Sequence, residues 1–99
     1  MDVRYTLHQI QFEWDSAKAE ANLIKHKVSF EEACQAFFDP FVYVLEDEVH
    51  RDESRETLLG MTLQWNVLYV VYTIRQGDLF RIISARPATS VERRLYEEQ

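Results

Sequence analysis

Apolar and polar residues alternate over residues 5–14, YTLHQIQFEW, and this period of two predicts a β-strand. The period changes after Asp15, a favourable N-cap, because the following residues repeat at helical spacing. The apolar face of this helix would hold Ala17, Ala21 and Ile24, and a polar face Lys18, Asn22 and Lys25. We therefore expect a strand followed directly by an amphipathic helix.

A second helix is predicted after Ser29. Ser29 and Glu32, three residues later, form the pattern of a capping box, in which each side chain binds a backbone N–H at the helix start. The helix should end at Pro40, because a proline ring does not fit inside a helix. The residues expected to be buried are Phe30, Ala33, Cys34 and Phe37.

Two segments of opposite character follow. Residues 41–46, FVYVLE, are rich in β-branched and aromatic side chains, which predicts a strand. Residues 46–57 contain six acids, two arginines and one histidine. This segment is too polar for a core and too long for a tight turn, so we expect an exposed loop.

The C-terminal third predicts a β-hairpin and a helix. Residues 67–75 and 79–86 read as two strands, and Gly77 between them supplies the positive φ that a short turn requires. Thr89 and Glu92 form a second capping-box pattern, which predicts a terminal helix.

A further strand is expected at residues 58–63, LLGMTL, after the acidic loop. The order of elements, β-α-α-β-β-β-β-α, predicts a single α+β domain over residues 1–99. The two N-terminal helices would cover one face of a mostly antiparallel sheet of about four or five strands, followed by a C-terminal helix. The strand 67–75 is apolar on both faces near its middle. Short helices do not easily cover both faces of such a sheet, so we expect one face to meet another chain.

The charge distribution places any anion-binding site in the C-terminal half. The chain has 99 residues and a net charge of −6, which argues against strong binding of a polyanion. Residues 1–60 hold six Lys and Arg against thirteen Asp and Glu, a net −7, whereas residues 61–99 hold five Arg against four acids, a net +1. Positive surface is therefore expected mainly after residue 60.

The sequence favours a cytoplasmic location. Cys34 is the only cysteine, so it cannot form an internal disulfide. The N-terminal residues lack the uninterrupted apolar segment of a secretory signal, and no run approaches the length of a membrane span.

Three arginines on the predicted hairpin need either partners or a ligand. The turn brings Arg75 close to Arg81, and like charges across a hairpin are unfavourable. Arg81 and Arg86 are separated by an odd number of residues, so they share a face only if a β-bulge intervenes near Ser84. Two interpretations remain open: ion pairs with acids of the N-terminal half, or an anionic ligand such as phosphate.

The histidines allow two interpretations as well. His26, next to Lys25, either caps the first helix or acts as a general acid or base. His50 is either a solvated surface residue or a proton-transfer group. The single cysteine and three scattered histidines lack metal-ligand spacing, and the chain has no glycine-rich phosphate loop.

Taken in order, several segments resemble the BrnT family of toxins from bacterial type II toxin–antitoxin modules. Two of them are the most specific: the Lys-His-x-Val-Ser-Phe junction between the helices and the Ile-Ser-Ala-Arg-x-Ala-Thr segment near the C-terminus. The resembling segments are FEWD at 12–15, KAEANLIKHKVSFEEA at 18–33, FFDP at 37–40, an H-x-x-E-x-R pattern at His50, Glu53 and Arg55, Gly60, VVYTIR at 70–75, and RIISARPATSVERRLYEE at 81–98.

The resemblance implies a RelE-like fold and an endoribonuclease that cleaves RNA without a metal or other cofactor and thereby blocks translation. Its implied partner is a BrnA-type antitoxin, a DNA-binding dimer through which alone the complex would reach operator DNA. Arg81 and Arg86 would bind the reacting phosphate, and His50 or His26, assisted by Lys25, would transfer protons. The residues implied in RNA binding are Arg55, Tyr72 and Arg75.

Two other functions are compatible with the sequence. One is a catalytically inactive module that docks a DNA-binding partner and contributes only to regulation of the operon. The other is a binder of small anionic molecules, although the chain has no recognisable pocket motif for one.

Overall fold

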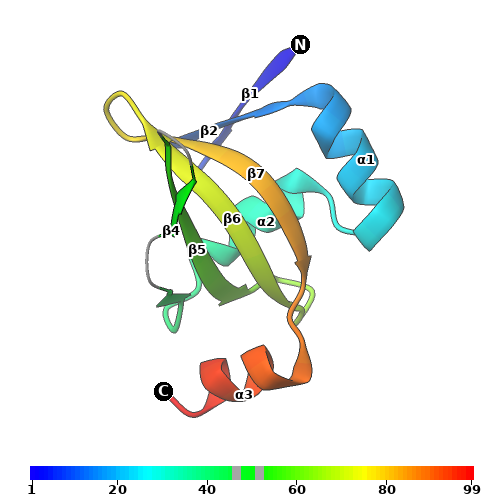
Figure 1. Cartoon of the computed structure of the whole chain (residues 1–99), viewed down its shortest axis with the longest axis vertical. Helices are drawn as coiled ribbons and strands as arrows, with labels where there is room; N and C mark the ends of the chain where they lie inside the picture. The colour runs from blue at the N-terminus through cyan, green and yellow to red at the C-terminus, as the bar shows by residue number, and fades with distance from the viewer. Residues whose placement is uncertain (46–47, 51–52) are drawn as a thin grey trace.

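The computed structural model describes residues 1–45, 48–50 and 53–99, with the backbone alone for 48–50 and 53–54. It confirms an α+β arrangement of three helices and a twisted sheet (Figure 1). In chain order the elements are β1 (Asp2–Leu7), β2 (Ile10–Asp15), α1 (Ser16–His26), α2 (Phe30–Ala36), β3 (Tyr43–Val44), β4 (Glu48–His50), β5 (Glu53–Met61), β6 (Val67–Arg75), β7 (Leu79–Pro87) and α3 (Ser90–Glu97).

The sheet is larger than the sequence predicted, and it is mixed. Its strands follow the order β1-β2-β7-β6-β5-β3, and β4 pairs additionally with β5. β2 runs parallel to β7, whereas the other neighbours are antiparallel. The expectation of four or five mostly antiparallel strands is therefore wrong in detail, because the N-terminal hairpin adds to the free edge of β7.

The segment predicted as one strand over 5–14 is in fact a hairpin. β1 and β2 pair in register from Asp2↔Asp15 to Leu7↔Ile10. The turn consists of His8 and Gln9, both with positive φ, of 50° and 70°. Positive φ at two successive positions is typical of hairpin turns built from Gly or Asn, and neither is present here. The sequence therefore carried no turn signal at this point.

Helix α1 begins as predicted, but its inward face is not the predicted one. The Asp15 carboxylate accepts the backbone N–H of Lys18, which confirms the N-cap. Ala17, Ala21 and Ile24 are exposed, and Asn22 is the buried residue.

Asn22 is buried because it completes the backbone hydrogen bonding of a strand edge. Its amide nitrogen donates to the carbonyl oxygens of Ala85 and Val28 at 2.8 and 3.0 Å, and its oxygen accepts from the Ala85 N–H at 3.2 Å. Ala85 lies on β7 beyond the stretch that pairs with β2. Helix α1 is thus fixed beside the sheet edge.

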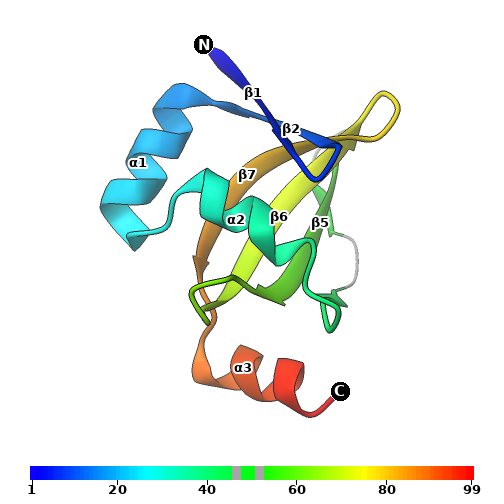
Figure 2. The ribbon, with the colours of Figure 1, turned by 180° about the vertical axis from the view of Figure 1, so that it is seen from behind.

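Helix α2 covers one face of the sheet, as Figure 2 shows from behind. The Ser29 hydroxyl accepts the Glu32 N–H at 3.0 Å, so the predicted start is correct. The Glu32 carboxylate, however, accepts hydrogen bonds from Thr62 and Asn66. Three of the four residues predicted to be buried are so, and Phe37 is partly buried against them.

Gly60 allows the close approach of α2 to β5. A Cβ at this position would lie 2.3 Å from the carbonyl oxygen of Ala36 and 2.9 Å from its Cβ. Only glycine therefore fits where the end of the helix meets the strand.

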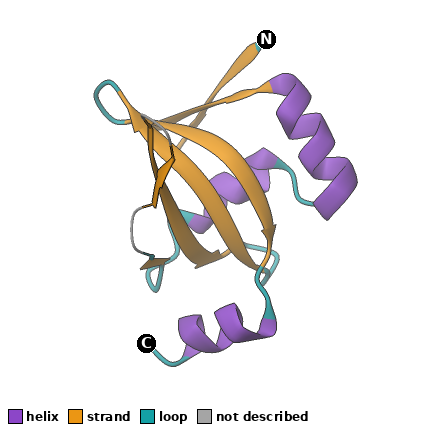
Figure 3. Cartoon of the chain, in the orientation of Figure 1, coloured by secondary structure: helices purple, strands orange, loops and turns teal. Residues whose placement is uncertain are grey.

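Helix α3 lies beyond the ends of β5 and β7 (Figure 3) and contacts β5. Its predicted capping box is present, since Thr89 and Glu92 each bind the other's backbone N–H. Tyr96 joins Leu59 and Val67 in a second apolar cluster and donates a hydrogen bond to Asp39. The chain's own C-terminal helix thus covers part of the second sheet face, and whether another chain meets the rest stays a prediction.

The acidic segment 46–57 contains more regular structure than expected. The exposed loop predicted there is wrong for residues 53–57, because they begin β5, and Thr57 is buried. β4 and β5 pair as a short hairpin. In the part of the chain that the structure describes, no helix is long and apolar enough to cross a membrane.

Candidate functional site

A β-bulge in β7 brings the two central arginines to one face of the sheet. Val71 pairs with Ser84, whereas its neighbour Tyr72 pairs with Ile82, so one extra residue lies between them on β7. The condition stated from the sequence for a shared face, a bulge near Ser84, is therefore met. Because the extra residue reverses the alternation, Arg81 and Arg86 both lie on the face away from α2. We call this surface of β5, β6 and β7 the arginine face.

A row of charged and polar residues crosses the sheet at Arg81. The paired positions run from Arg4 on β1 to Glu13 on β2, Arg81 on β7 and Thr73 on β6. Glu13 binds both neighbouring guanidinium groups, with Oε1 3.2 Å from Arg4 Nε and Oε2 2.9 Å from Arg81 Nη1. Adjacent charges in the row therefore alternate in sign, which stabilises them across the strands.

Arg81 is paired twice. Besides Glu13, it donates from Nη1 and Nη2 to the Asp2 carboxylate, both at 3.2 Å. The bond to Asp2 contributes most to raising the pKa of Arg81, and the same bond lowers the pKa of Asp2. The Arg81 side chain is only 17% exposed, whereas that of Asp2 is 55% exposed. An incoming anion would therefore compete more readily with Asp2 than with Glu13.

Arg86 is held at the start of α3. Its two terminal nitrogens donate to the Glu92 carboxylate at 2.8 and 2.9 Å, a bidentate arrangement. Its guanidinium also lies over the ring of Tyr69, 4.1 Å from the ring centre. The expected ion pair with acids of the N-terminal half is thus confirmed for Arg81. It is wrong for Arg86, whose partner Glu92 lies in the C-terminal half, and both guanidinium groups have fixed orientations.

The other two arginines of interest have no carboxylate partner among the described residues. Arg55 precedes Glu56, which pairs with Tyr72, so Arg55 lies beside Thr73 on the neighbouring strand. Its Nε is buried without a hydrogen bond. Arg75 pairs with Leu79 across the hairpin, not with Arg81, and is exposed at the end of β6. Arg55 on β5 and Arg75 on β6 therefore lie near Thr73, where the row of charged and polar residues ends.

Lys25 and His26 lie elsewhere. They end α1, followed by Lys27, whose φ of 62° closes the helix in the left-handed conformation. The partly buried His26 lines a separate cavity of about 220 Å³ between the end of α1 and the link from β7 to α3, together with Arg93. The structure therefore does not bring these two residues onto the arginine face.

The remaining candidates are His50 on β4 and Tyr72 on β6. The backbone of His50 pairs with Glu53 in the β4–β5 hairpin, but its side chain lies outside the described residues. Tyr72 is 5% exposed and packs its ring against Phe37 and Phe80 on the face covered by α2. The structure thus places Tyr72 in the core beneath the arginine face, and its role in RNA binding stays a prediction.

Several residues of this site carry no recognisable signal in the sequence. Asp2 and Glu13 reach Arg81 only because β2 lies parallel to β7. Thr73 and Tyr69 read as ordinary strand residues. The excess of acids in the N-terminal half was the single usable signal, and it pointed to ion pairs without saying which.

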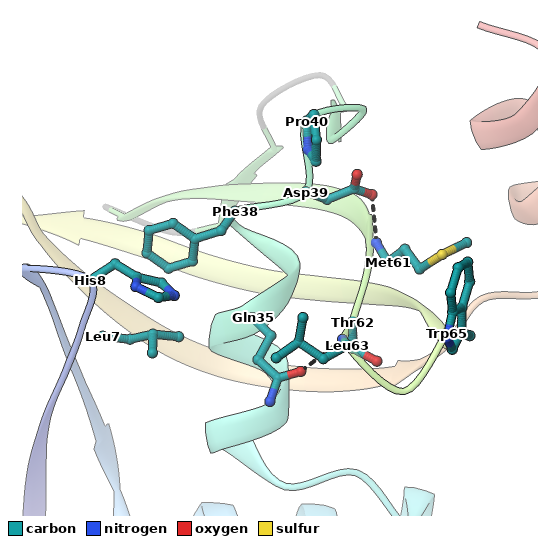
Figure 4. A pocket seen from close by; sticks show the side chains of 10 residues that line it. All are labelled: Leu7, His8, Gln35, Phe38, Asp39, Pro40, Met61, Thr62, Leu63 and Trp65. Carbon is teal, nitrogen blue, oxygen red and sulfur yellow. Dashed lines mark hydrogen bonds between the residues drawn. The ribbon is translucent and has the colours of Figure 1, made fainter.

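An apolar pocket of about 350 Å³ lies apart from the arginine face (Figure 4). His8, from the first turn, stacks edge-on against Phe38 after α2. Trp65, in the turn before β6, is 80% exposed and has a φ of 68°. The residues lining the pocket are Leu7, His8, Gln35, Phe38, Asp39, Pro40, Met61, Thr62, Leu63 and Trp65.

The arginine face has the chemistry of an anion site. It offers guanidinium groups from three neighbouring strands, which are rigid elements and hold the groups with little freedom to reorganise. Among the residues that the structure describes, no three His, Cys, Asp or Glu side chains are grouped so that they could hold a metal ion.

Comparisons with known proteins identify relatives. A family model described as the ribonuclease toxin BrnT of type II toxin–antitoxin systems matches residues 14–92. The chain is also similar to the crystal structure of the Brucella abortus ribonuclease toxin BrnT, with a TM-score of 0.53 and 20% identity, over 78% of this chain and 94% of that chain. This structural likeness concerns the fold alone. No curated protein sequence matches the chain.

Proposed function

Because the chain belongs to the BrnT family of ribonuclease toxins of type II toxin–antitoxin systems, we propose that it is a RelE-like endoribonuclease that cleaves RNA without a metal ion and so inhibits translation in the cytoplasm. The observation that carries the proposal is the arginine face, where the bulge in β7 aligns Arg81 and Arg86. The family membership also bears out the resemblance seen in the sequence.

The proposed reaction uses the RNA's own nucleophile. A base removes the proton of a ribose 2′-OH, the oxygen attacks the adjacent phosphorus, and the bond to the 5′-oxygen breaks as an acid returns a proton to it. The products are a 2′,3′-cyclic phosphate and a 5′-hydroxyl. The negative charge that develops on the phosphate oxygens is stabilised by fixed cations.

Arg81 and Arg86 are the proposed catalytic cations. Their carboxylate partners hold each guanidinium in place before substrate arrives, which reduces the reorganisation needed during the reaction. The phosphate takes the place of the exposed Asp2 carboxylate at Arg81, while Glu13 keeps its contact. Arg55 and Arg75, which have no carboxylate partner among the described residues, bind the flanking RNA backbone.

Proton transfer is assigned to histidine. His50 is the first candidate, because its strand β4 pairs with the segment of β5 that includes Arg55. His26 and Lys25 are the second candidates. Because they lie away from the arginine face, they would contact a more remote part of the RNA or the ribosome. Tyr72 supports the arginine face from beneath.

A BrnA-type antitoxin is the proposed partner. It is a DNA-binding dimer, and it covers the part of the second sheet face that α3 leaves exposed. The complex reaches operator DNA only through this antitoxin. Such a cover would account for the apolar residues on both faces of β6, of which α3 buries only the part around Tyr96.

Expression of the chain in bacteria tests this proposal. Expression alone should stop growth and degrade RNA, and co-expression of a BrnA-type antitoxin or the change Arg86→Ala should restore both. Arg94→Ala, which removes an exposed cation from α3, is the matched control and should remain toxic. Normal growth and intact RNA during confirmed expression of the folded chain would overturn the proposal.

A second candidate function is a catalytically inactive module that docks the DNA-binding antitoxin and assists operon regulation. The observation in its favour is that carboxylates of the chain itself already pair with Arg81 and Arg86. In that case antitoxin binding would survive Arg86→Ala, and RNA would stay intact at every concentration of the wild-type chain.

A further inference from the structure

Thr73 is a buried hydroxyl without a hydrogen bond. Its residue is 3% exposed, in the middle of the sheet, and Oγ1 has no partner in the part of the chain that the structure describes. A buried polar atom left unsatisfied costs about 1–3 kcal/mol. A valine would fill the same space at no such cost, so the hydroxyl calls for an explanation.

A second unsatisfied atom lies on the neighbouring strand. The Nε of Arg55 is likewise buried with no hydrogen-bond partner. Arg55 stands beside Thr73, because the pairs Thr57↔Val71 and Glu56↔Tyr72 fix the register of β5 and β6 there. The only two side-chain atoms of this kind in the described residues are therefore cross-strand neighbours.

Thr73 also completes the charged row described above. On its other side it pairs with Arg81 of β7. The hydroxyl thus lies between a guanidinium that has two carboxylate partners and one that has none among the described residues. Among the described side chains, no carboxylate balances the positive charge on the Arg55 side.

Both unsatisfied groups can donate a hydrogen bond, and one of them carries a positive charge. A ligand that satisfies both must present oxygen acceptors and negative charge, which is the chemistry of a phosphodiester. We infer that Thr73 and Arg55 form a phosphate subsite on the arginine face, in which the Thr73 hydroxyl positions a non-bridging oxygen of the RNA backbone. This inference rests on the proposed ribonuclease function and adds to it Thr73, a residue of the segment VVYTIR that had no assigned role.

The subsite differs from Arg81 and Arg86 in what binding must displace. At those two arginines a phosphate competes with carboxylates of the chain, whereas Thr73 and Arg55 offer it donors that have no hydrogen-bond partner among the described residues.

An oligodeoxynucleotide is the appropriate probe, because it carries the phosphodiesters but lacks the 2′-OH needed for cleavage. Fluorescence anisotropy should show binding by the wild-type chain that weakens as salt is raised. Thr73→Ser keeps the hydroxyl and should bind as the wild type does. Thr73→Val should bind about tenfold more weakly, as expected for one lost hydrogen bond to a charged group.

Matched controls separate the hydroxyl from the fold. Thr57→Val changes another buried threonine of the same face, outside the row, and should leave binding unchanged. Without the probe, Thr73→Val should unfold at a higher temperature than the wild type, because it removes an unsatisfied buried hydroxyl. Equal binding by Thr73→Val and the wild type, or no binding by the wild type, would overturn the subsite, and a water molecule would then be the partner of these atoms.

RNA cleavage measured on the same proteins distinguishes this inference from the proposed function. Binding of the probe that depends on Thr73 while RNA stays intact would keep the subsite and refute the nuclease. Cleavage that Thr73→Val leaves unchanged, with unchanged probe binding, would keep the nuclease and refute the subsite.

Discussion

Glu13 on β2 and Arg81 on β7 are direct partners in the parallel strand pair, and their side chains meet at 2.9 Å. Glu13 also binds Arg4, so one nearly buried carboxylate holds two guanidinium groups. This contact links the N-terminal hairpin to the strand that carries both proposed catalytic arginines.

Glu13→Gln should trade stability for anion affinity. Removing the charge leaves Arg4 and Arg81 without their shared partner and should lower the free energy of unfolding by about 2 kcal/mol. The freed positive charge should strengthen binding of an oligodeoxynucleotide at low salt. Urea denaturation and anisotropy measure the two effects, with Glu31→Gln on the exposed side of α2 as the control. Unchanged values for both would contradict the role given to Glu13.

The bidentate pair of Arg86 and Glu92 predicts a loss of stability in acid. Hydrogen bonds from Arg86 hold the pKa of Glu92 below its ordinary value of 4.5. Since the folded chain favours the charged form, the stabilisation is complete above that value and is lost as pH falls through the lower, folded pKa. For this partly exposed pair the contribution should be about 1 kcal/mol.

The measurement is thermal unfolding of the wild type and Glu92→Gln between pH 2 and pH 7. The variant should be less stable at neutral pH, and the difference should shrink as the solution becomes more acidic. A difference that stays constant over the whole range would show that the ion pair does not contribute.

Gly60→Ala should destabilise the fold more than Gly77→Ala. The added Cβ at Gly60 meets the backbone of Ala36 at 2.3 Å, so α2 or β5 must shift, at about 1–3 kcal/mol. At Gly77 nothing lies within 4 Å, and only the positive φ of 68° opposes the change, at about 1 kcal/mol. Equal unfolding midpoints for the two variants would contradict the close contact.

Tyr96 should titrate unusually late. Burial and the hydrogen bond to Asp39 raise its pKa to about 12, from an ordinary value of 10.0. Because the folded chain favours the neutral phenol, this stabilisation is complete below pH 10 and is lost as pH rises towards 12. Absorbance at alkaline pH should show one late tyrosine that Tyr96→Phe removes. A titration curve identical in the variant would refute the assignment.

The sequence predicted the helix starts well, because each depends on local chemistry. Asp15, Ser29 and Thr89 are all N-caps in the structure. The odd separation of Arg81 and Arg86 showed only that a bulge would be needed for them to share a face, and the structure contains that bulge.

Long-range features could not be predicted in the same way. The turn at His8 and Gln9 uses residues that rarely adopt positive φ, so one strand was expected where two exist. Asn22 is buried because it bonds to Ala85, 63 residues away, and polarity alone places asparagine outside. The partners of Arg81 depend likewise on β2 joining β7, which no local pattern indicates.

Cleavage of RNA by the arginine face without a metal ion can be measured on a gel of end-labelled RNA incubated with the purified chain in EDTA. We expect fragments with 2′,3′-cyclic phosphate and 5′-hydroxyl ends from the wild type and Arg94→Ala, and intact RNA with folded Arg81→Ala and Arg86→Ala. RNA that stays intact with the wild type, both free and on ribosomes, would contradict it.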